Sequence, residues 1–194
     1  MNIVYRFRIY PNKSQKELFA RTFGCVRFVY NRMLAEKIEY YEKTGKVLKV
    51  TPAKYKAEFP WLKEVDSLAL CNAQLHLQTA YKNFFRDSSV GFPKFKSKHH
   101  SRNSYTTNVV NGNILVESKR IRLPKLKWIS MKKHREPAEG LRLKSVTVSM
   151  EPSGKYFASL LYEGYSCENQ AAEPDYSTAK ILGIDYAMPV SYTH

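Results

Sequence analysis

The chain has 194 residues and a formal net charge of +15, with 32 lysines and arginines against 17 acidic residues. Its hydrophobic content of 43% excludes a disordered basic tail, because that much apolar side chain can form a packed core. The charge indicates a polyanionic partner, most often nucleic acid, although a basic surface that only confers solubility is the alternative.

The lack of a recognisable targeting signal and the spacing of the cysteines both favour a cytoplasmic location. No apolar run approaches the roughly 20 residues of a membrane span, and "MNIVYRFRIY" alternates apolar and polar residues where a signal peptide would have an apolar core. We therefore expect no membrane partner. Cys25, Cys71 and Cys167 lie far apart and form no CxxC motif, which favours a reducing, cytoplasmic environment.

The first half of the chain predicts a strand and two long helices. Residues 2–10 alternate apolar side chains with arginines, which is typical of a strand with one buried face. A capping box at Ser14 and Glu17 predicts a helix that runs to about Lys43, and Gly24 inside it indicates either close packing or a break. The predicted apolar stripe is Phe19, Phe23, Val26, Tyr30, Leu34, Ile38 and Tyr41. Residues 52–66 predict a short helix or loop, and a second long helix is expected from Ser67 to about Asp87.

The second half predicts an extended segment followed by strands. "GFPKFKSKHHSRNSY" is basic, aromatic and typical of an extended arm. "VVNGNILV" carries an Asn-Gly hairpin turn, "RIRLPKLKWISM" and "LRLKSVTVSM" each predict a strand, and "EPSGKYFASLLYE" turns at Ser-Gly into another. Residues 166–178 predict a linker, and residues 180–186 a final buried strand.

The positive charge is concentrated in one part of the chain. Residues 88–144 hold 14 lysines and arginines but only three acidic residues, a net charge of +11. A cluster of this kind is expected where phosphates are bound, because affinity then comes from counterion release. Four aromatic residues are interleaved with it, and they could stack on bases or, as we favour for Phe92 and Trp128, pack in a core. They are Phe92, Phe95, Tyr105 and Trp128.

One motif suggests catalysis. "ILGIDYAM" places Asp185 on a strand that reads as buried, as expected for the first metal ligand of an RNase H-type nuclease. Two-metal phosphate chemistry needs several carboxylates, however, and one Asp at a strand end is also found in ordinary turns and caps. The sequence has no phosphate-binding glycine loop and no nucleophile–base motif.

Eight short stretches follow one another along the chain: "RIYPNKSQ", "FGCVRFVYNRML", "WLKEVDSLALCNAQLHLQTAYKNFF", "GFPKFKSK", "NSYTTN", "RIRLPKLKWI", "VTVSMEPSGKYFASLLYE" and "ILGIDY". Together, and in this order, they resemble the TnpB (OrfB) family of transposon-encoded proteins, which accompany insertion elements and are relatives of the type V CRISPR effectors. The resemblance implies an RNA-guided DNA nuclease with a RuvC catalytic domain, and it extends to Asp185.

The resemblance implies an α+β architecture. Residues 1–10 and 105–165 would form a small antiparallel wedge-type β-barrel. Residues 11–104 would form an inserted helical recognition lobe, in older descriptions a helix-turn-helix, with a basic arm at 88–104. The linker at 166–178 would lead to the start of an RNase H-like (RuvC) domain at 179–188. Residues 189–194, "PVSYTH", do not continue the family pattern and can be encoded by a sequencing-adapter sequence, so we expect a non-native tail.

The resemblance also implies roles for particular residues. Asp185 matches the first RuvC carboxylate, which is both catalytic and a metal ligand. The positions where the family contacts a target-adjacent DNA motif are Ser67, Leu68, Cys71, Asn72, Thr107 and Asn111. The side chains expected to contact the nucleic-acid backbone are Arg6, Arg8, Lys94, Lys96, Lys98, Arg102, Lys125, Lys127, Lys132 and Lys133.

The implied partners are a guide RNA and a double-stranded target DNA, and the sequence leaves the oligomeric state open. The complete nuclease would use Mg²⁺ and would carry zinc in a four-cysteine ribbon within a part that this chain lacks. We expect no cofactor and no DNA cleavage for the 194-residue chain alone. The alternative is a nuclease-free guide-RNA- and DNA-binding protein, such as a repressor-like derivative. The order of the stretches disfavours a third possibility, an ordinary basic RNA-binding structural protein.

Overall fold

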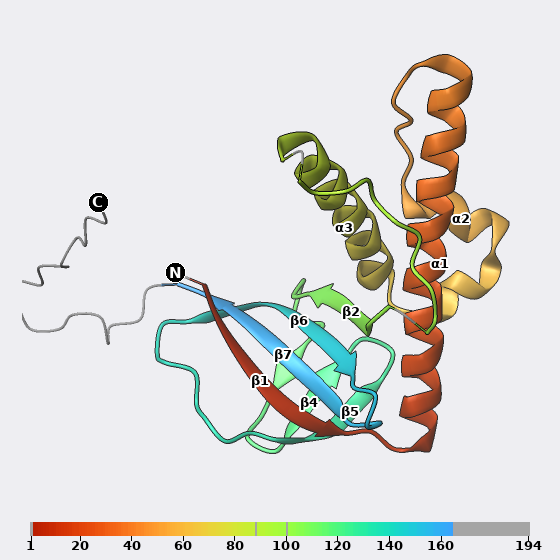
Figure 1. The fold of residues 1–194 in the computed structure, drawn as a ribbon. Coiled ribbons are helices and arrows are strands. Elements are labelled where there is room, and N and C mark those ends of the chain that lie inside the picture. Colours follow the sequence, from red (N-terminus) through yellow and green to blue (C-terminus); the bar gives the residue numbers. More distant parts are fainter. Residues whose placement is uncertain (1, 88, 100, 165–194) are drawn as a thin grey trace, which may run out of the picture.

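The computed structural model describes residues 2–87, 89–99 and 101–164. Within these residues the fold is α+β, with a seven-stranded antiparallel sheet and a group of helices inserted between its first two strands (Figure 1). The predicted linker at 166–178, the predicted strand at 180–186 and Asp185 lie outside the described residues. None of the described helices has the length and apolar character that crossing a membrane requires.

The sheet is built around the N-terminal strand. Its strands are β1 (Asn2–Tyr10), β2 (Asn103–Asn108), β3 (Leu115–Val116), β4 (Arg120–Leu123), β5 (Lys127–Lys132), β6 (Arg142–Met150) and β7 (Tyr156–Glu163), in the spatial order β2-β6-β7-β1-β5-β4-β3. In β1, Phe7 and Ile9 are buried whereas Arg6 and Arg8 are exposed, which confirms the predicted alternation.

The sheet is open, and the closed barrel expected from the sequence is not formed. Strand β2 pairs only with β6, and β3 pairs only with β4, so these two strands are the edges. The predicted Asn-Gly turn exists, with Asn111 at φ 50° and Gly112 at φ 68°, but it connects the two edges and does not join a hairpin. Because residues 109–114 span at most about 25 Å when extended, the sheet must curl enough to bring its edges within that reach.

The stretch "RIRLPKLKWISM" forms a hairpin, whereas the sequence predicted a single strand. Strands β4 and β5 pair with Arg120 opposite Ser130 and Leu123 opposite Lys127. Lys125 and Lys127 adopt φ values of 65° and 59° at the turn. Residues other than glycine and asparagine rarely adopt this left-handed backbone conformation, so the two lysines do not predict a turn from the local sequence.

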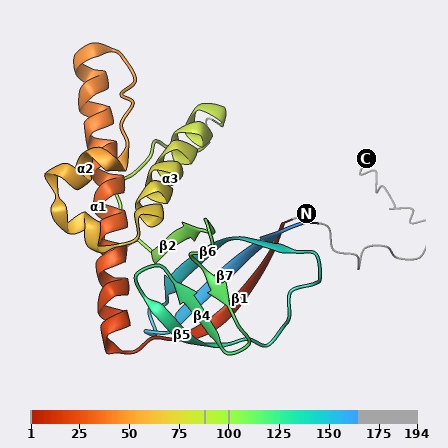
Figure 2. The same cartoon turned by 180° about the vertical axis from the view of Figure 1, so that it is seen from behind.

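The first helix, α1 (Lys13–Thr44), begins slightly earlier than predicted. Its capping box uses Asn12 and Gln15, and not the predicted Ser14 and Glu17. The helix ends at Gly45, which has the left-handed φ of 66° that favours glycine. Of the predicted stripe, the first five residues are buried, Ile38 is half-buried and Tyr41 is exposed. The half of α1 near Lys13 lies beside the sheet, and the other half projects away from it (Figure 2).

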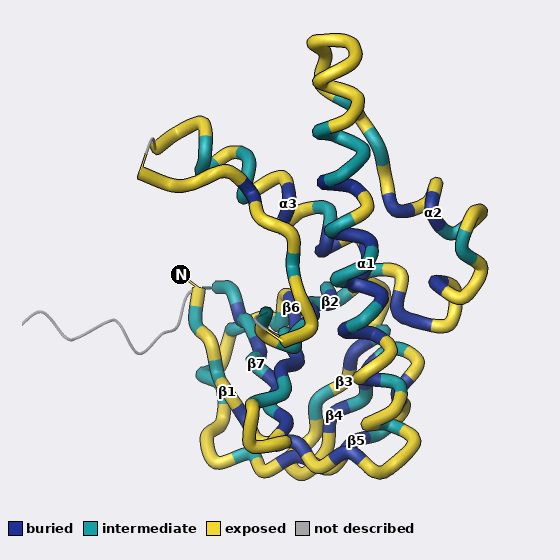
Figure 3. The backbone as a smooth tube through the Cα atoms, turned by 45° about the vertical axis from the view of Figure 1, so that its right-hand side comes forward, coloured by how far each residue is buried: buried dark blue, intermediate teal, exposed yellow. Residues whose placement is uncertain are grey.

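Two further helices complete the inserted region. Helix α3 (Ser67–Arg86) has the predicted bounds within one residue and is capped by Asp66, whose carboxylate accepts a hydrogen bond from the Leu68 N–H. Between α1 and α3 lie α2 (Pro52–Glu58) and the short 3₁₀ helix η1 (Pro60–Glu64). Buried residues continue from the sheet into the helices, whereas the projecting end of α1 is mainly exposed (Figure 3).

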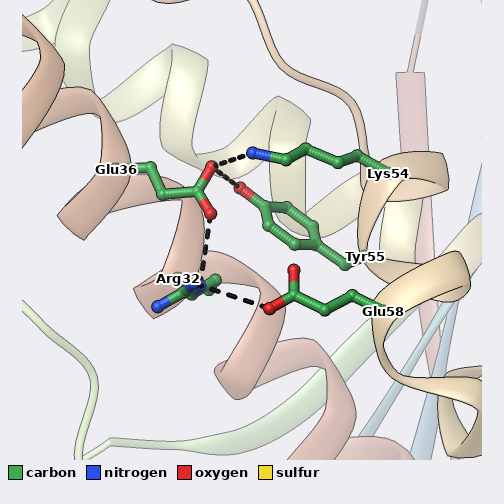
Figure 4. A network of polar contacts seen from close by, with 5 residues as sticks. All are labelled: Arg32, Glu36, Lys54, Tyr55 and Glu58. Carbon is green, nitrogen blue, oxygen red and sulfur yellow. Dashed lines mark hydrogen bonds and ion pairs between the residues drawn. The ribbon is translucent and has the colours of Figure 1, made fainter.

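A polar network fixes α2 to α1 (Figure 4). The Glu36 carboxylate accepts hydrogen bonds from Lys54 Nζ and Tyr55 Oη, each at 2.9 Å, and pairs with Arg32 Nε at 3.2 Å. Arg32 also lies 3.7 Å from Glu58. Burial raises the pKa of Glu36, but the hydrogen bonds and the nearby positive charges outweigh it, so that its pKa lies below the ordinary value.

Candidate nucleic-acid interface

The predicted basic arm spans residues 88–104. Its described residues 89–99 and 101–102 run from the end of α3 along α1 to β2, which begins at Asn103 (Figure 1). Asn31 of α1 fixes it at one point, where its amide group donates to the Lys96 carbonyl and accepts from the Lys96 N–H, both at 2.8 Å. The Lys96 ammonium lies 4.1 Å from the centroid of the Tyr30 ring. The arm is therefore held against the helix by its backbone and by one of its cations.

A second group of cations lies on the exposed face of the sheet. Arg8 of β1 and Lys132 of β5 are directly opposite each other in the antiparallel register, and both are exposed. Two like charges facing each other across a strand pair are destabilising unless an anion lies near them. On the same strand, Arg6 lies over the Phe157 ring at 4.0 Å and is paired with Glu151 at 2.5 Å.

The β4–β5 turn presents a third group. Gln15 Nε2 donates to the carbonyls of Leu126 and Trp128, at 2.9 and 2.8 Å, and so fastens this turn to the start of α1. Lys125 and Lys127, which flank Leu126, are exposed. Trp128 is half-buried under the Arg120 guanidinium, 4.5 Å from the ring centroid, and so does not lie in the core as we favoured.

Most of the predicted phosphate contacts are unpaired. Of the ten cations, Arg6 is paired with Glu151 and Lys133 with Glu136. In the part of the chain that the structure describes, the other eight make no ion pair. They are Arg8, Lys94, Lys96, Lys98, Arg102, Lys125, Lys127 and Lys132. Of the ten predicted contacts, these eight have charge available for an external phosphate.

The residues predicted to contact a target-adjacent motif lie near the junction of α3 and β2, but they are not equally accessible. Asn72 is buried, and its amide donates to the Leu68 carbonyl at 2.9 Å and lies 3.5 Å from Asn108 Oδ1 of β2. Thr107 is fully buried and its hydroxyl has no partner among the described residues.

The other predicted residues at this junction are more open to solvent. Ser67, Cys71 and Asn111 are exposed, and Leu68 is half-buried. Ser67 accepts a hydrogen bond from Lys56 Nζ at 2.6 Å. The accessible polar groups are therefore those of Ser67 and Asn111, with the Cys71 thiol beside them on α3.

The described residues contain no group of three or more histidine, cysteine or acidic side chains that could hold a metal ion. They therefore offer no fit for a catalytic Mg²⁺, and the predicted ligand Asp185 lies outside them. Cys25 is not a candidate nucleophile, because burial, together with the charge of Glu64, raises its thiol pKa to about 11.

Three side chains of this surface were not predicted from the sequence. Asn31 and Arg27 of α1, and His76 of α3, lie beside the arm. The only local signal was the four-residue spacing of Arg27 and Asn31, which places them on one side of a helix. The contact of Asn31 with Lys96, 65 residues later in the sequence, depends on tertiary packing.

The described residues form an α+β protein, and the eight predicted cations that make no ion pair among these residues lie on the arm, the β4–β5 turn and one face of the sheet. A family model described as a helix-turn-helix domain (HTH_OrfB_IS605) matches residues 1–46. In the described part of that range the structure forms strand β1 and a single helix, α1.

Three curated proteins are similar to this chain. The "Putative RNA-guided DNA endonuclease" of Streptomyces pristinaespiralis is 35% identical over 193 residues, covering 93% of this chain and 45% of that protein. The "Putative RNA-guided DNA endonuclease InsQ" of Escherichia coli (strain K12) is 31% identical over 188 residues, covering 93% of this chain and 44% of InsQ. The "Virulence protein VsdF" of Salmonella dublin is 36% identical over 106 residues, covering 47% of this chain and 89% of VsdF.

The chain belongs to the TnpB/OrfB family. It spans slightly less than half the length of the two endonuclease relatives.

Proposed function

We propose that this chain is the nucleic-acid-binding N-terminal part of a TnpB-type RNA-guided DNA endonuclease. Its partners would be a guide RNA and a double-stranded target DNA. The observation that carries the proposal is the set of eight cations on the arm, the β4–β5 turn and the sheet face that make no ion pair with any described residue. The names of the two endonuclease relatives support this activity for the complete protein.

In this proposal the two structural parts have different roles. The sheet, at 1–10 and 105–165, is the wedge domain, and the inserted region, at 11–104, is the recognition lobe. The insertion of α1, α2 and α3 between β1 and β2 supports this division. The arm leads from the recognition lobe back to the sheet, so a nucleic-acid strand bound along the arm would contact both the lobe and the wedge domain.

The junction of α3 and β2 would contact the target-adjacent motif. Ser67 and Asn111 supply exposed hydrogen-bonding groups there, and hydrogen bonds to base edges are what distinguish one DNA sequence from another. Asn72 and Thr107 are buried, so their role would be to support this surface from beneath or to become exposed when DNA binds.

In the complete protein, Asp185 would be a ligand of Mg²⁺ in a RuvC-like catalytic domain that starts at residues 179–188. The linker at 166–178 would connect this domain to the sheet, and residues 189–194 would be a non-native tail. Zinc would bind in a ribbon outside this chain. A single carboxylate cannot hold two metal ions. The 194-residue chain should therefore bind nucleic acid without cutting it.

The test is the salt dependence of binding to a labelled single-stranded RNA and a labelled duplex DNA. The logarithm of the affinity should fall steeply with the logarithm of the salt concentration, and the double variant Lys94→Gln/Lys98→Gln should reduce that slope by about two. The control is Lys46→Gln/Lys49→Gln, which removes the same charge from exposed positions near the end of α1 that projects from the sheet. Equal slopes for the two double variants would refute a localised interface.

The same preparations test for cleavage. Incubation with Mg²⁺, RNA and duplex DNA should leave the DNA intact, and cutting that disappears in Asp185→Ala would overturn the claim that this chain lacks a complete catalytic site. The nuclease-free alternative makes a different prediction for the longer gene product, which would bind DNA with its guide and still leave it uncut.

A further inference from the structure

A small pocket lies where the basic arm meets the helices. Its volume is about 170 Å³, which is large enough for a phosphate group. Three separate segments form its walls: the middle of α1, one residue of α3, and the end of the arm with the start of β2. The lining residues are Phe23, Val26, Arg27, His76, Lys96, Ser101, Arg102, Asn103 and Ser104.

The charges around this pocket all have one sign. Arg27, Lys96 and Arg102 are cationic, His76 can become so, and none of the lining residues is acidic. Burial lowers the pKa of Lys96. Burial also lowers the pKa of His76, and the charge of Lys96 lowers it further. The ligand-free pocket therefore holds positive charge without a counterion among its lining residues, a costly arrangement that a bound anion would relieve.

The pocket is also held in shape before any ligand arrives. The two hydrogen bonds between Asn31 and the Lys96 backbone fix the position of the arm, and the Tyr30 ring supports the Lys96 ammonium. Ser101, Asn103 and Ser104 add neutral polar groups to the lining. A rigid set of donors around a small space binds a tetrahedral anion with little loss of conformational entropy.

We propose that this pocket binds one backbone phosphate of the nucleic-acid strand that follows the arm, with Arg27 and Arg102 as guanidinium donors and Lys96 as the buried charge. The proposal rests on the proposed function and adds a defined phosphate site to it. A strand is favoured over a free ion because Lys94 and Lys98, on either side of Lys96 in the arm, are exposed and unpaired within the described residues. They are placed to contact neighbouring phosphates.

The first experiment separates a defined site from general attraction. Asn31→Ala removes both hydrogen bonds to the arm without changing the net charge. It should weaken binding of the labelled RNA about tenfold at fixed salt, because the arm loses the two hydrogen bonds that hold Lys96 against α1. Arg102→Lys keeps the charge but loses the planar guanidinium, and it too should bind more weakly than the wild type. Unchanged affinity in both variants would overturn the defined site.

The second experiment uses charge removal with a matched control. Arg102→Gln and Lys96→Met should each reduce the salt slope of RNA binding by about one. Lys46→Gln, at an exposed position remote from the pocket, should leave it nearly unchanged. Because Arg102 is exposed, the Arg102→Gln variant should fold normally. The Lys96→Met variant loses the contact between the ammonium and the Tyr30 ring, which could destabilise the fold, so Arg102→Gln is the decisive variant. A slope that Arg102→Gln leaves at its wild-type value would count against the pocket while leaving the proposed function intact.

Inorganic phosphate distinguishes the two sources of the anion. It should raise the melting temperature of the wild-type chain slightly and that of Arg102→Gln less, and the labelled RNA should raise the wild-type value further. Protection by phosphate without any binding of RNA or duplex DNA would refute both the strand assignment and the proposed function. RNA binding with equal phosphate protection in wild type and Arg102→Gln would refute the pocket alone.

Discussion

Gly24 lies in the middle of α1, and an added Cβ there would have no neighbouring atom within 4 Å. Neither reason that the sequence suggested for this glycine is present, because the helix is continuous and nothing packs closely against the residue. The position therefore carries only the entropic cost of glycine in a helix.

Replacing Gly24 with alanine should stabilise the free protein. We expect a gain of about 0.5–1 kcal/mol, seen as a rise of about 1–4 °C in the melting temperature of a protein of this size. Gly45→Ala is the control and should lose about 1 kcal/mol, because φ at that residue is in the left-handed region. A fall in the melting temperature of Gly24→Ala would show that the helix cannot accept a methyl group there.

Thr107 combines complete burial with an unpartnered hydroxyl among the described residues. Thr107→Val should raise the free energy of unfolding by about 1 kcal/mol, because an unpaired polar group is replaced by an apolar one of the same shape. If the hydroxyl is retained for DNA contact, the same variant should lose discrimination between target-adjacent sequences. Denaturant titration and competition binding measure the two effects, and a destabilised Thr107→Val would show that the hydroxyl is satisfied.

Among the elements, the packing of α2 against α1 depends on one carboxylate. The pKa of Glu36 is lower in the folded protein than its ordinary value of 4.5, so its contribution to stability is complete above that value and is lost as the pH falls through the folded pKa. Glu36→Gln should therefore be less stable than the wild type at neutral pH, and the difference should shrink in acid. Urea midpoints measured well above and well below pH 4.5 test this, and a difference that grew in acid would contradict it.

Local signals predicted some elements well and others poorly. The strand β1, the helices α1 and α3, and the β6–β7 hairpin follow from periodicity and the Ser-Gly turn, which are properties of neighbouring residues, although the capping residues of α1 were predicted wrongly. Strand pairing is not local. The Asn-Gly turn at 111–112 suggested a hairpin, yet pairing of β2 with β6 and of β3 with β4 determined the outcome.

The candidate site divides in the same way. The charge of the arm and the exposed arginines of β1 could be predicted from the sequence, because composition and alternation reveal them. The pocket could not, because Arg27, His76 and Arg102 come from three segments that only the packed fold brings together. The pairing of Arg6 with Glu151 likewise joins residues far apart in the sequence, and the local pair of Lys133 with Glu136 depends on the conformation of the segment after β5.

For the whole molecule, a net charge of +15 has opposite effects on stability and binding. Moderate salt should raise the melting temperature of the free chain, because it screens repulsion between cations such as Arg8 and Lys132. The same salt should weaken binding of RNA and DNA, because counterions released into a more concentrated salt solution gain less entropy. Thermal melts and binding titrations over one salt series test this pair of trends, and a melting temperature that falls with salt would refute the first.

The pairing of β1 with β7 has a consequence for synthesis on the ribosome. Asn2 is opposite Glu163 and Ile9 is opposite Tyr156, so the first strand to be made is completed by the last described strand. At about 5–20 residues per second, β1 waits on the order of ten seconds for that partner, while α1 and α3 can already form from local contacts. During this interval the edge of β1 that pairs with β7 has no partner, and the exposed charges of Arg6 and Arg8 should disfavour pairing of the nascent strand with other chains.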